Sequence, residues 1–264
     1  MFAGKTVVIT GAGSGIGRAL ALRFAQANSR LALSDINSPA LQETLSLLPA
    51  GLDARGYTLD VSDCDAVFAH AADIKRDFGT AHVVINNAGA AIAGTVAQTS
   101  IAEYQWMMNI NLYGVLHGTK AFLPMLLAQR EGWVVNVSSV FGLFGYPTQS
   151  AYAMSKFAVR GLTECLWLEL EGSGVRAVSV HPAGIKSNIE KNSKMAALAT
   201  EAERSVVHKL DSKMTETAES SAESIYDGLL RGKRRILVGR QAPFSQLMTR
   251  LFPDSYPTLL KRLG

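Results

Sequence analysis

Short apolar runs alternate with longer amphipathic segments along most of this chain, and no other feature restricts its fold as strongly. Several of the runs are almost continuous in Val, Ile and Leu, which is typical of strands covered by helices on both faces. Strands that alternate with helices pair in parallel, because each helix carries the chain back across the sheet. The predicted strands are Lys5–Thr10, Arg30–Asp35, Arg55–Asp60, Ala81–Asn86, Gly132–Ser138, Val175–His181 and Arg235–Val238.

Helical segments separate these runs, and the longest of them contains Pro124. A proline inside a helix lacks the N–H donor and clashes with the preceding turn, so we expect it to bend or break that helix. The predicted helices are Gly15–Asn28, Asp63–Phe78, Ile101–Arg130, Ser150–Leu170 and Thr217–Arg231. No repeat, linker or composition shift interrupts the pattern. We therefore expect a single doubly wound α/β domain of the Rossmann type over residues 1–240, with about seven parallel strands.

Two segments stand outside this alternation. The polar stretch Lys186–Thr215 shows no strand pattern, and such insertions commonly serve as lids or binding loops, so we interpret it as a substrate loop. Residues 241–264 form a C-terminal tail in which apolar residues follow a helical period. This amphipathic tail could touch anionic lipid or cover a pocket, but packing on its own domain or on a neighbouring subunit is the interpretation we favour. The apolar positions of the tail are Phe244, Leu247, Met248, Leu251 and Phe252.

The composition is that of an ordinary globular protein, with 264 residues of which 48% are hydrophobic. No run of about 18 apolar residues is present, so we expect no membrane-spanning helix. Met1–Gly4 lead straight into a strand-like run, which leaves no room for a secretion signal. Two cysteines, Cys64 and Cys165, suggest no disulfide framework. These features together favour the cytoplasm.

The net charge of +4 arises at the C-terminal end. Basic residues could favour an anionic partner there, but solvated surface charge is the interpretation we favour, and no nucleic-acid recognition module is present. The basic residues of this end are Arg231, Lys233, Arg234, Arg235, Arg240, Arg250, Lys261 and Arg262, against the single acid Asp254.

A glycine-rich turn, Thr10–Gly17, follows the first predicted strand and opens the first predicted helix. Glycines there allow a tight turn and let the backbone approach a pyrophosphate at the positive end of the helix. The spacing of Gly11, Gly15 and Gly17 is GxxxGxG rather than GxGxxG. A glycine turn without a ligand remains the alternative, but the strand before it and the helix after it favour a dinucleotide site.

Asp35 ends the second predicted strand, 18 positions after Gly17. A carboxylate at this place accepts hydrogen bonds from the ribose hydroxyls of an adenosine and repels a 2′-phosphate. Ser14 occupies the turn position where a phosphate-binding base could stand, and Ile36 follows the aspartate. Arg18 lies on the helix beyond the turn. The sequence therefore favours NAD over NADP, with a simple strand-end cap as the other interpretation of Asp35.

Tyr152 and Lys156 are four residues apart on a predicted helix, so their side chains share one face. Ser138 and Ser139 close the fifth predicted strand, whose carboxyl end faces the ligand crevice of a parallel sheet. Exchanging a proton with an alcohol or ketone oxygen needs an acid or base, and a phenol with a pKa of about 10 is a poor base at neutral pH. A nearby ammonium group stabilises the phenolate and lowers that pKa.

These residues and their order resemble the short-chain dehydrogenase/reductase family over most of the chain, from about Lys5 to Ser187. The matching pieces are Thr10–Gly17, Asp60-Val61, Asn86-Asn87-Ala88-Gly89, Asn111-Leu112-Tyr113-Gly114, Ser138-Ser139, Tyr152-Ala153-Met154-Ser155-Lys156 and His181-Pro182-Ala183-Gly184. The resemblance implies an oxidoreductase that transfers a hydride between a nicotinamide cofactor and a secondary alcohol or ketone. It also implies dimers or tetramers formed through the two helices that carry Asn111 and Tyr152.

By this resemblance Tyr152 is the general acid/base, Lys156 lowers its pKa and Ser139 orients the substrate oxygen. Asn111 supports a proton relay, whereas Asn109 lies elsewhere on its helix. No metal ion is expected. The implied cofactor contacts are Gly11, Ser14, Gly15, Ile16, Gly17, Asp35, Asp60, Val61, Asn87, Ala88, Gly89, Tyr152, Lys156, Pro182, Gly184, Ile185 and Ser187.

Two positions depart from the family pattern. The family commonly has Pro-Gly after the sixth strand, and here Ala183 separates Pro182 from Gly184. The hydroxyl that a threonine often supplies after this turn comes from Ser187. Neither change removes a chemical function.

The segment Val140–Tyr146 after the predicted catalytic serine is apolar and aromatic. If it walls the substrate pocket, the substrate is an apolar alcohol or ketone; packing beneath the loop or in a subunit contact is the alternative. A cofactor-sensing protein without turnover is the main rival to an enzyme. The intact set Asn111, Ser139, Tyr152 and Lys156 argues against it.

Overall fold

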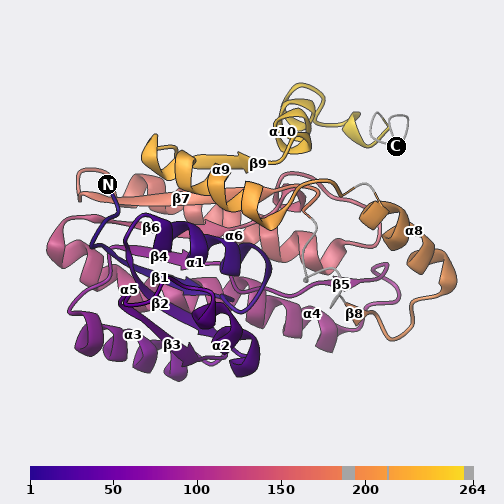
Figure 1. Ribbon diagram of the computed structural model, residues 1–264. Helices are drawn as coiled ribbons and strands as arrows, with labels where there is room; N and C mark the ends of the chain where they lie inside the picture. Colours follow the sequence, from indigo (N-terminus) through magenta and orange to yellow (C-terminus); the bar gives the residue numbers. More distant parts are fainter. Residues whose placement is uncertain (186–193, 213, 259–264) are drawn as a thin grey trace.

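A computed structural model of the chain describes residues 1–185, 194–212 and 214–258 (Figure 1). Its main sheet has seven strands, and each pair of neighbours in it is parallel. The seven predicted strands are thereby confirmed, with ends that differ by a few residues at most. Their bounds are β1 Thr6–Thr10, β2 Arg30–Asp35, β3 Ala54–Thr58, β4 Val83–Asn86, β6 Gly132–Val137, β7 Val175–Pro182 and β9 Arg235–Val238.

The strand order is β3-β2-β1-β4-β6-β7-β9, so the chain begins in the middle of the sheet. It runs outward through β2 to β3, returns to β4 on the other side of β1, and continues to the opposite edge. The order therefore reverses between β1 and β4. In doubly wound sheets the carboxyl ends of the strands at such a reversal open into a crevice that binds ligands.

Helices cover both faces of this sheet (Figure 1). One hydrophobic cluster joins α1 and α9 to the first face, and another joins α3, α5 and α6 to the second. The doubly wound architecture is confirmed. The bounds of the helices in the main layers are α1 Gly15–Gln26, α2 Ser38–Ser46, α3 Cys64–Phe78, α4 Ile101–Met108, α5 Gly114–Gln129, α6 Ser150–Glu169 and α9 Ala218–Leu230.

Pro124 was expected to bend or break its helix, and a break is excluded because α5 continues through Pro124 to Gln129. Pro124 and Lys120 both lie on the exposed side of the helix. Water can therefore solvate the Lys120 carbonyl that loses its helical partner, while the buried Phe122 and Leu126 hold the helix on the sheet. Helical geometry changes earlier, where α4 and α5 are joined by the π-helix η1, Asn109–Tyr113.

Several short elements were absent from the sequence prediction. The substrate-loop segment was expected to be free of strands, but β8, Lys194–Met195, pairs in parallel with β5, Ile92–Ala93. A helix, α8, follows at Glu201–Ser212. The helix α2 was also missed, although the Asn37 side chain caps it by accepting a hydrogen bond from Ala40 N–H.

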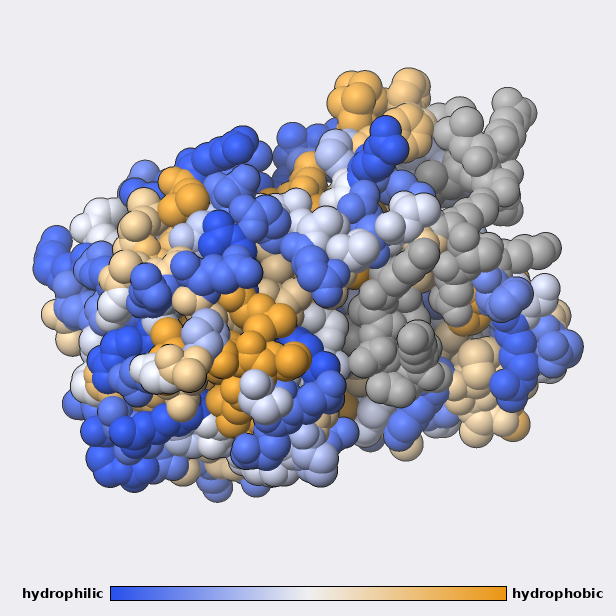
Figure 2. All heavy atoms as spheres, viewed as in Figure 1, coloured by the Kyte–Doolittle hydropathy of each residue, from blue (hydrophilic) through white to orange (hydrophobic). Residues whose placement is uncertain are grey.

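The amphipathic tail begins as α10, Gln241–Leu251, as its periodicity predicts. Ala242 and Ser245 are buried against the domain, whereas Phe244 is 47% and Leu247 55% exposed. Figure 2 shows apolar side chains gathered over α10 at the top of the molecule. Most of the apolar face of α10 is thus not packed on its own domain within the described residues. No helix in these residues is long and apolar enough to cross a membrane.

Candidate active site

The glycine turn packs directly against the residues that follow β4. A Cβ atom on Gly17 would lie 2.0 Å from the Gly11 carbonyl oxygen, and one on Gly11 would lie 2.8 Å from Ala88 Cα. The Thr10 hydroxyl accepts hydrogen bonds from the backbone N–H groups of Asn87 and Ala88, each at 3.0 Å. The turn and the segment after β4 therefore form one unit at the point where the strand order reverses.

The start of α1 suits a phosphate group. Gly11 has a φ of +66°, which only a glycine adopts without strain. Ser14 precedes the helix in an extended conformation, and its side chain makes no capping hydrogen bond. Gly15, Ile16 and Gly17 then supply the N–H groups of the first turn. These groups have no partner within the helix and form its positive end. The residues present thus fit the pyrophosphate of a dinucleotide.

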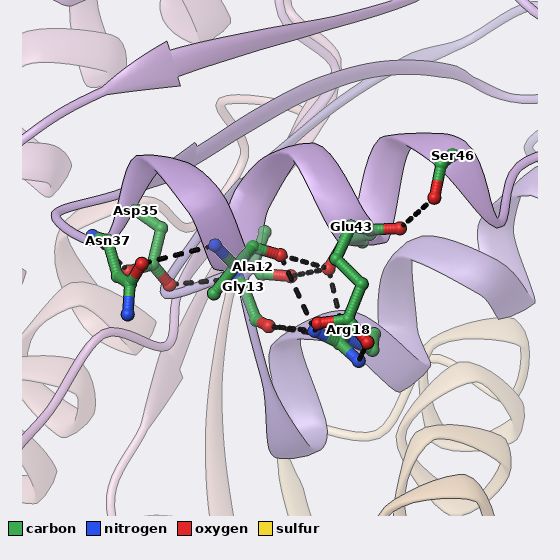
Figure 3. Close-up of polar contacts among 9 residues, drawn as sticks. Ala12, Gly13, Arg18, Asp35, Asn37, Glu43 and Ser46 are labelled. Carbon is green, nitrogen blue, oxygen red and sulfur yellow. Dashed lines mark hydrogen bonds and ion pairs between the residues drawn. The ribbon is translucent and has the colours of Figure 1, made fainter.

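Asp35 lies at the carboxyl end of β2 and contacts the glycine turn (Figure 3). One of its carboxylate oxygens accepts a hydrogen bond from Gly13 N–H at 2.8 Å. The other oxygen accepts one from Asn37 N–H, also at 2.8 Å. This carboxylate sits where an adenosine ribose approaches in such folds.

Asp60 and Val61 follow β3, which ends two residues before Asp60, at Thr58. The Asp60 carboxylate is exposed and accepts hydrogen bonds from the backbone N–H and the hydroxyl of Ser62. Val61 is mostly buried against Gly114, at the start of α5.

Asn111 lies in the π-helix η1 and is fully buried. Its side-chain oxygen accepts a hydrogen bond from Ala90 N–H at 2.8 Å, and its amide donates to the Ala90 carbonyl at 3.0 Å. Asn109 is exposed, in agreement with its expected place elsewhere on the helix. Single π-turns occur frequently at functional sites, since they redirect a side chain within a helix.

Lys156 and Tyr152 project from one face of α6, near its beginning. The Lys156 ammonium is 5.6 Å from the centre of the Tyr152 ring and donates to the Val137 carbonyl at 2.9 Å. Burial lowers the pKa of Lys156 to about 8. A Cβ atom on Gly89 would lie 3.6 Å from Lys156 Nζ and 3.1 Å from Asn111 Oδ1. Lys156 and Asn111 therefore meet beside Gly89, in the segment after β4.

Ser139 lies two residues after the end of β6 and caps the short helix η2, Val140–Gly142, by accepting a hydrogen bond from Phe141 N–H. The Phe141 ring lies edge-on to the Tyr152 ring, with centres 6.3 Å apart. Ser138 instead donates its hydroxyl to the Lys156 carbonyl inside α6, at 2.8 Å. The two serines therefore face different surroundings.

Two supporting residues escaped the sequence analysis. His181 is fully buried, and its Nδ1 lies 2.9 Å from the Ser139 carbonyl oxygen while its Nε2 lies 2.7 Å from the Ser179 hydroxyl. Burial lowers the pKa of His181 to about 4. A neutral ring that donates through Nδ1 satisfies both partners. Ser155 accepts from the Asn111 amide and donates to the Tyr152 carbonyl. Both residues lie within the matching motifs, but the motifs alone do not reveal these contacts.

The segment after β7 leaves the sheet at the same edge as the segments after β4 and β6, because these strands are parallel neighbours. Pro182 is the last residue of β7, and Gly184 follows with a φ of +63°. The Gly184 carbonyl accepts hydrogen bonds from the N–H groups of Thr215 and Glu216, and Ile185 forms a parallel bridge with Glu216. Ser187 lies outside the described residues.

The apolar segment after Ser139 is divided between burial and partial exposure. Val140, Leu143 and Phe144 are buried in a cluster that also contains Ala183 and Ala242 of α10. Phe141 and Tyr146 lie at the margin of this cluster and are partly exposed. Part of the segment thus packs beneath the loop. The rings of Phe141 and Tyr146 remain partly exposed, as a wall of a substrate pocket requires. Across the described ranges, no three His, Cys, Asp or Glu side chains are grouped to hold a metal ion.

A parallel sheet whose strand order reverses beside a glycine turn, with a buried lysine close to a tyrosine and to the segment after β4, defines a dinucleotide-dependent oxidoreductase. Comparison with known proteins gives the particular family. The profile of the family described as short chain dehydrogenase matches residues 5–197. The chain belongs to the short-chain dehydrogenase/reductase family and is an NAD(P)-dependent oxidoreductase.

Curated relatives and solved structures agree with this assignment. The chain is 40% identical to the oxidoreductase SadH of Mycobacterium tuberculosis, over 98% of this chain and 95% of the relative. It is 30% identical to estradiol 17-beta-dehydrogenase 11 of Macaca fascicularis, over 98% of this chain and 83% of that protein. A short-chain dehydrogenase/reductase from Burkholderia phymatum, solved in complex with NAD, superposes with a TM-score of 0.88 at 31% identity. That match covers 98% of this chain and 96% of the solved one.

Proposed function

We propose that this protein interconverts an apolar secondary alcohol and its ketone with NAD, and that Tyr152 exchanges the proton. The observation that carries the proposal is the buried Lys156 ammonium, 5.6 Å from the Tyr152 ring centre. With a pKa of about 8, Lys156 is still mostly protonated at neutral pH. Its positive charge, held in a buried position, favours the phenolate form of Tyr152 and so makes the tyrosine a usable base.

Asn111 and Ser139 complete the proposed catalytic set. Asn111 is fixed on both sides by the backbone of Ala90 and lies near Lys156, so it can hold a water molecule in a proton relay to that lysine. Ser139 is held at the end of β6, next to Phe141, whose ring touches that of Tyr152. Its hydroxyl can orient the substrate oxygen toward the phenol.

A bound nicotinamide supplies the hydride acceptor or donor, and the residues of the crevice bind and orient it. We propose that the glycine turn, with Gly11, Ser14, Gly15, Ile16 and Gly17, holds the pyrophosphate, and that Asp35 holds the adenosine ribose. Asp35 is a carboxylate at the end of β2, which is the support for NAD rather than NADP. The remaining proposed contacts are Asp60, Val61, Asn87, Ala88, Gly89, Tyr152, Lys156, Pro182, Gly184, Ile185 and Ser187.

The substrate class follows from the wall beside Ser139. Phe141 and Tyr146 are the partly exposed rings of that segment, and an apolar substrate would pack on them. The name of one relative, estradiol 17-beta-dehydrogenase 11, points to an apolar secondary alcohol as well. We include residues 186–215 as a substrate loop of the domain 1–240, with 241–264 as a tail.

We also propose a homodimer or homotetramer formed through α4, α5 and α6. The support is apolar surface left exposed on α6, where Met154 is 45%, Phe157 41% and Leu168 73% exposed. Exposed apolar surface on a protein commonly forms an interface with a second copy of the same chain. Sedimentation analysis measures the oligomer directly, and a monomer at micromolar concentration would contradict this proposal.

The decisive experiment is a screen of apolar and charged alcohols and ketones with NAD and NADP, followed by the absorbance of the reduced nicotinamide. Tyr152→Phe removes the proton-exchanging hydroxyl but keeps the ring, so we expect turnover to fall about 1000-fold while NAD still binds. Calorimetric titration of both proteins with NAD provides the control. NAD binding without turnover of any substrate by the wild type would instead favour the cofactor-sensing rival.

A further inference from the structure

Arg18 of α1 contacts the glycine turn, and its position is fixed by α2 (Figure 3). Its two terminal nitrogens donate to the two carboxylate oxygens of Glu43, at 2.9 Å and 2.7 Å. This bidentate pairing is the geometry in which a guanidinium and a carboxylate bind most strongly. The Arg18 Nε also donates to the Thr44 hydroxyl at 3.0 Å. Two neighbouring residues of α2 thus hold the guanidinium.

The same guanidinium contacts the turn itself. Arg18 donates to the Gly13 carbonyl oxygen from Nη2 at 2.6 Å and from Nε at 3.1 Å. The N–H of the same glycine is bound by Asp35 at 2.8 Å. Asp35 therefore binds the N–H group of Gly13, and Arg18 binds its carbonyl group. The charged partner of Arg18 is Glu43.

This arrangement bears on the choice between NAD and NADP. The two cofactors differ by a phosphate on the adenosine 2′-oxygen, which is the region that Asp35 faces in the proposed function. A cation at this corner would stabilise that phosphate. Arg18 is close enough to bond to the residue that Asp35 binds, but its charge is balanced by Glu43 and each of its nitrogens already has an acceptor.

We propose that Glu43 is a specificity-determining residue, which excludes NADP by holding and neutralising Arg18. Glu43 reaches no cofactor in this scheme, and it acts only through the arginine. The inference rests on the proposed dinucleotide site at the glycine turn. Asp35 repels the 2′-phosphate directly, and Glu43 removes the positive charge that would otherwise offset this repulsion.

The size of the effect follows from exposure. The Arg18 side chain is 24% exposed and that of Glu43 61%, so water and salt weaken the pairing. Glu43→Gln keeps the shape and some hydrogen bonding but removes the negative charge. We expect this variant to bind NADP roughly three- to fivefold more tightly than the wild type, since exposed ion pairs have effects of this order. Binding of NAD, which has no 2′-phosphate, should change much less.

The test is calorimetric titration of the wild type and variants with NAD and with NADP, at low and high salt. The matched control is Asp53→Asn, because Asp53 pairs with Arg30 at 2.7 Å at the opposite end of β2. This control makes the same change in net charge far from the proposed ribose site. The double variant Arg18→Ala/Glu43→Gln should lose the gain in NADP binding, and high salt should reduce it.

Three results would overturn the inference. One is unchanged NADP affinity in Glu43→Gln, and another is an equal gain in Asp53→Asn. The third is an equal change for both cofactors, which would assign the Arg18–Glu43 pair to the stability of the turn. A wild type that binds neither dinucleotide would remove the proposed function itself, which separates the two failures.

Discussion

Ser138 and Ser139 are adjacent residues of one type whose hydroxyl groups have different partners. Ser138 is 2% exposed and donates to the Lys156 carbonyl within α6, whereas Ser139 accepts from Phe141 N–H beside the Tyr152 ring. At the scale of single residues, two neighbouring hydroxyl groups just after β6 therefore have different roles, one in packing and one proposed in catalysis.

Alanine substitutions should separate these roles. We expect Ser139→Ala to lower kcat/KM about 100-fold, as the loss of a group that orients a reacting oxygen does, and to lose about 1 kcal/mol of stability with the cap of η2. Ser138→Ala should lower the free energy of unfolding by about 1 kcal/mol, because a buried hydrogen bond is lost, and should retain most activity. Steady-state kinetics and urea unfolding measure the two effects. Equal losses of activity in both variants would contradict the assignment of Ser139.

At the scale of elements, α4 is joined to the proposed substrate loop by one side chain. Glu103 accepts hydrogen bonds from the backbone and hydroxyl of Ser100 at the start of α4, and from Ala197 N–H, just after β8. These hydrogen bonds hold the pKa of Glu103 below its usual value, and the hydrogen bond from Ser100 N–H has the largest effect. The parallel pairing of β8 with β5 adds a second attachment of the loop.

The two attachments of Glu103 can be tested separately. Glu103→Ala removes the carboxylate half of the capping box and the bond to Ala197, but it keeps the backbone N–H that donates to the Ser100 hydroxyl. Ser100→Ala removes that hydroxyl and keeps the bond to Ala197. Each variant should lose about 1 kcal/mol of stability. We expect only Glu103→Ala to raise the substrate KM several-fold, because it alone releases the loop, with NAD binding unchanged in both. A similar KM for the two variants would show that this anchor does not position the loop.

The elements also show what a sequence can predict. Strands covered on both faces are nearly continuous apolar runs, so all seven strands of the main sheet were found. The Tyr152 and Lys156 pair was found because residues four apart share a helix face. By contrast, β8 is two residues long and depends on pairing with distant backbone, which leaves no periodic pattern. The π-turn at Asn111 and the contact of His181 with Ser139 depend on tertiary packing, so the motifs identified these positions without their geometry.

At the scale of the whole molecule, two histidines are buried in different parts of the fold. One belongs to a helix that covers the sheet, and the other lies at the end of a strand and supports the proposed site. His70 of α3 lies between Tyr57 and Phe122, with ring centres 4.7 Å and 6.2 Å away. His181 lies at the end of β7, beneath Ser139. Burial lowers the pKa of each to about 4, from an ordinary value of 6.5. Both histidines are therefore neutral in the folded protein near pH 6, where an unfolded chain has begun to protonate them.

The sign of the pH dependence follows from this difference in proton binding. Between pH 6.5 and 4 the unfolded chain binds more protons than the folded one, so stability is complete above pH 6.5 and is lost as the pH falls toward 4. Each histidine should account for a loss of about 2 kcal/mol at pH 5.

His70→Phe keeps an aromatic ring between Tyr57 and Phe122 but cannot be protonated. We expect urea unfolding at pH 7 and pH 5 to show a smaller loss of stability in this variant than in the wild type. Equal losses in the two proteins would mean that His70 does not contribute to acid unfolding, and the remaining dependence would then have to come from His181 and the carboxylates.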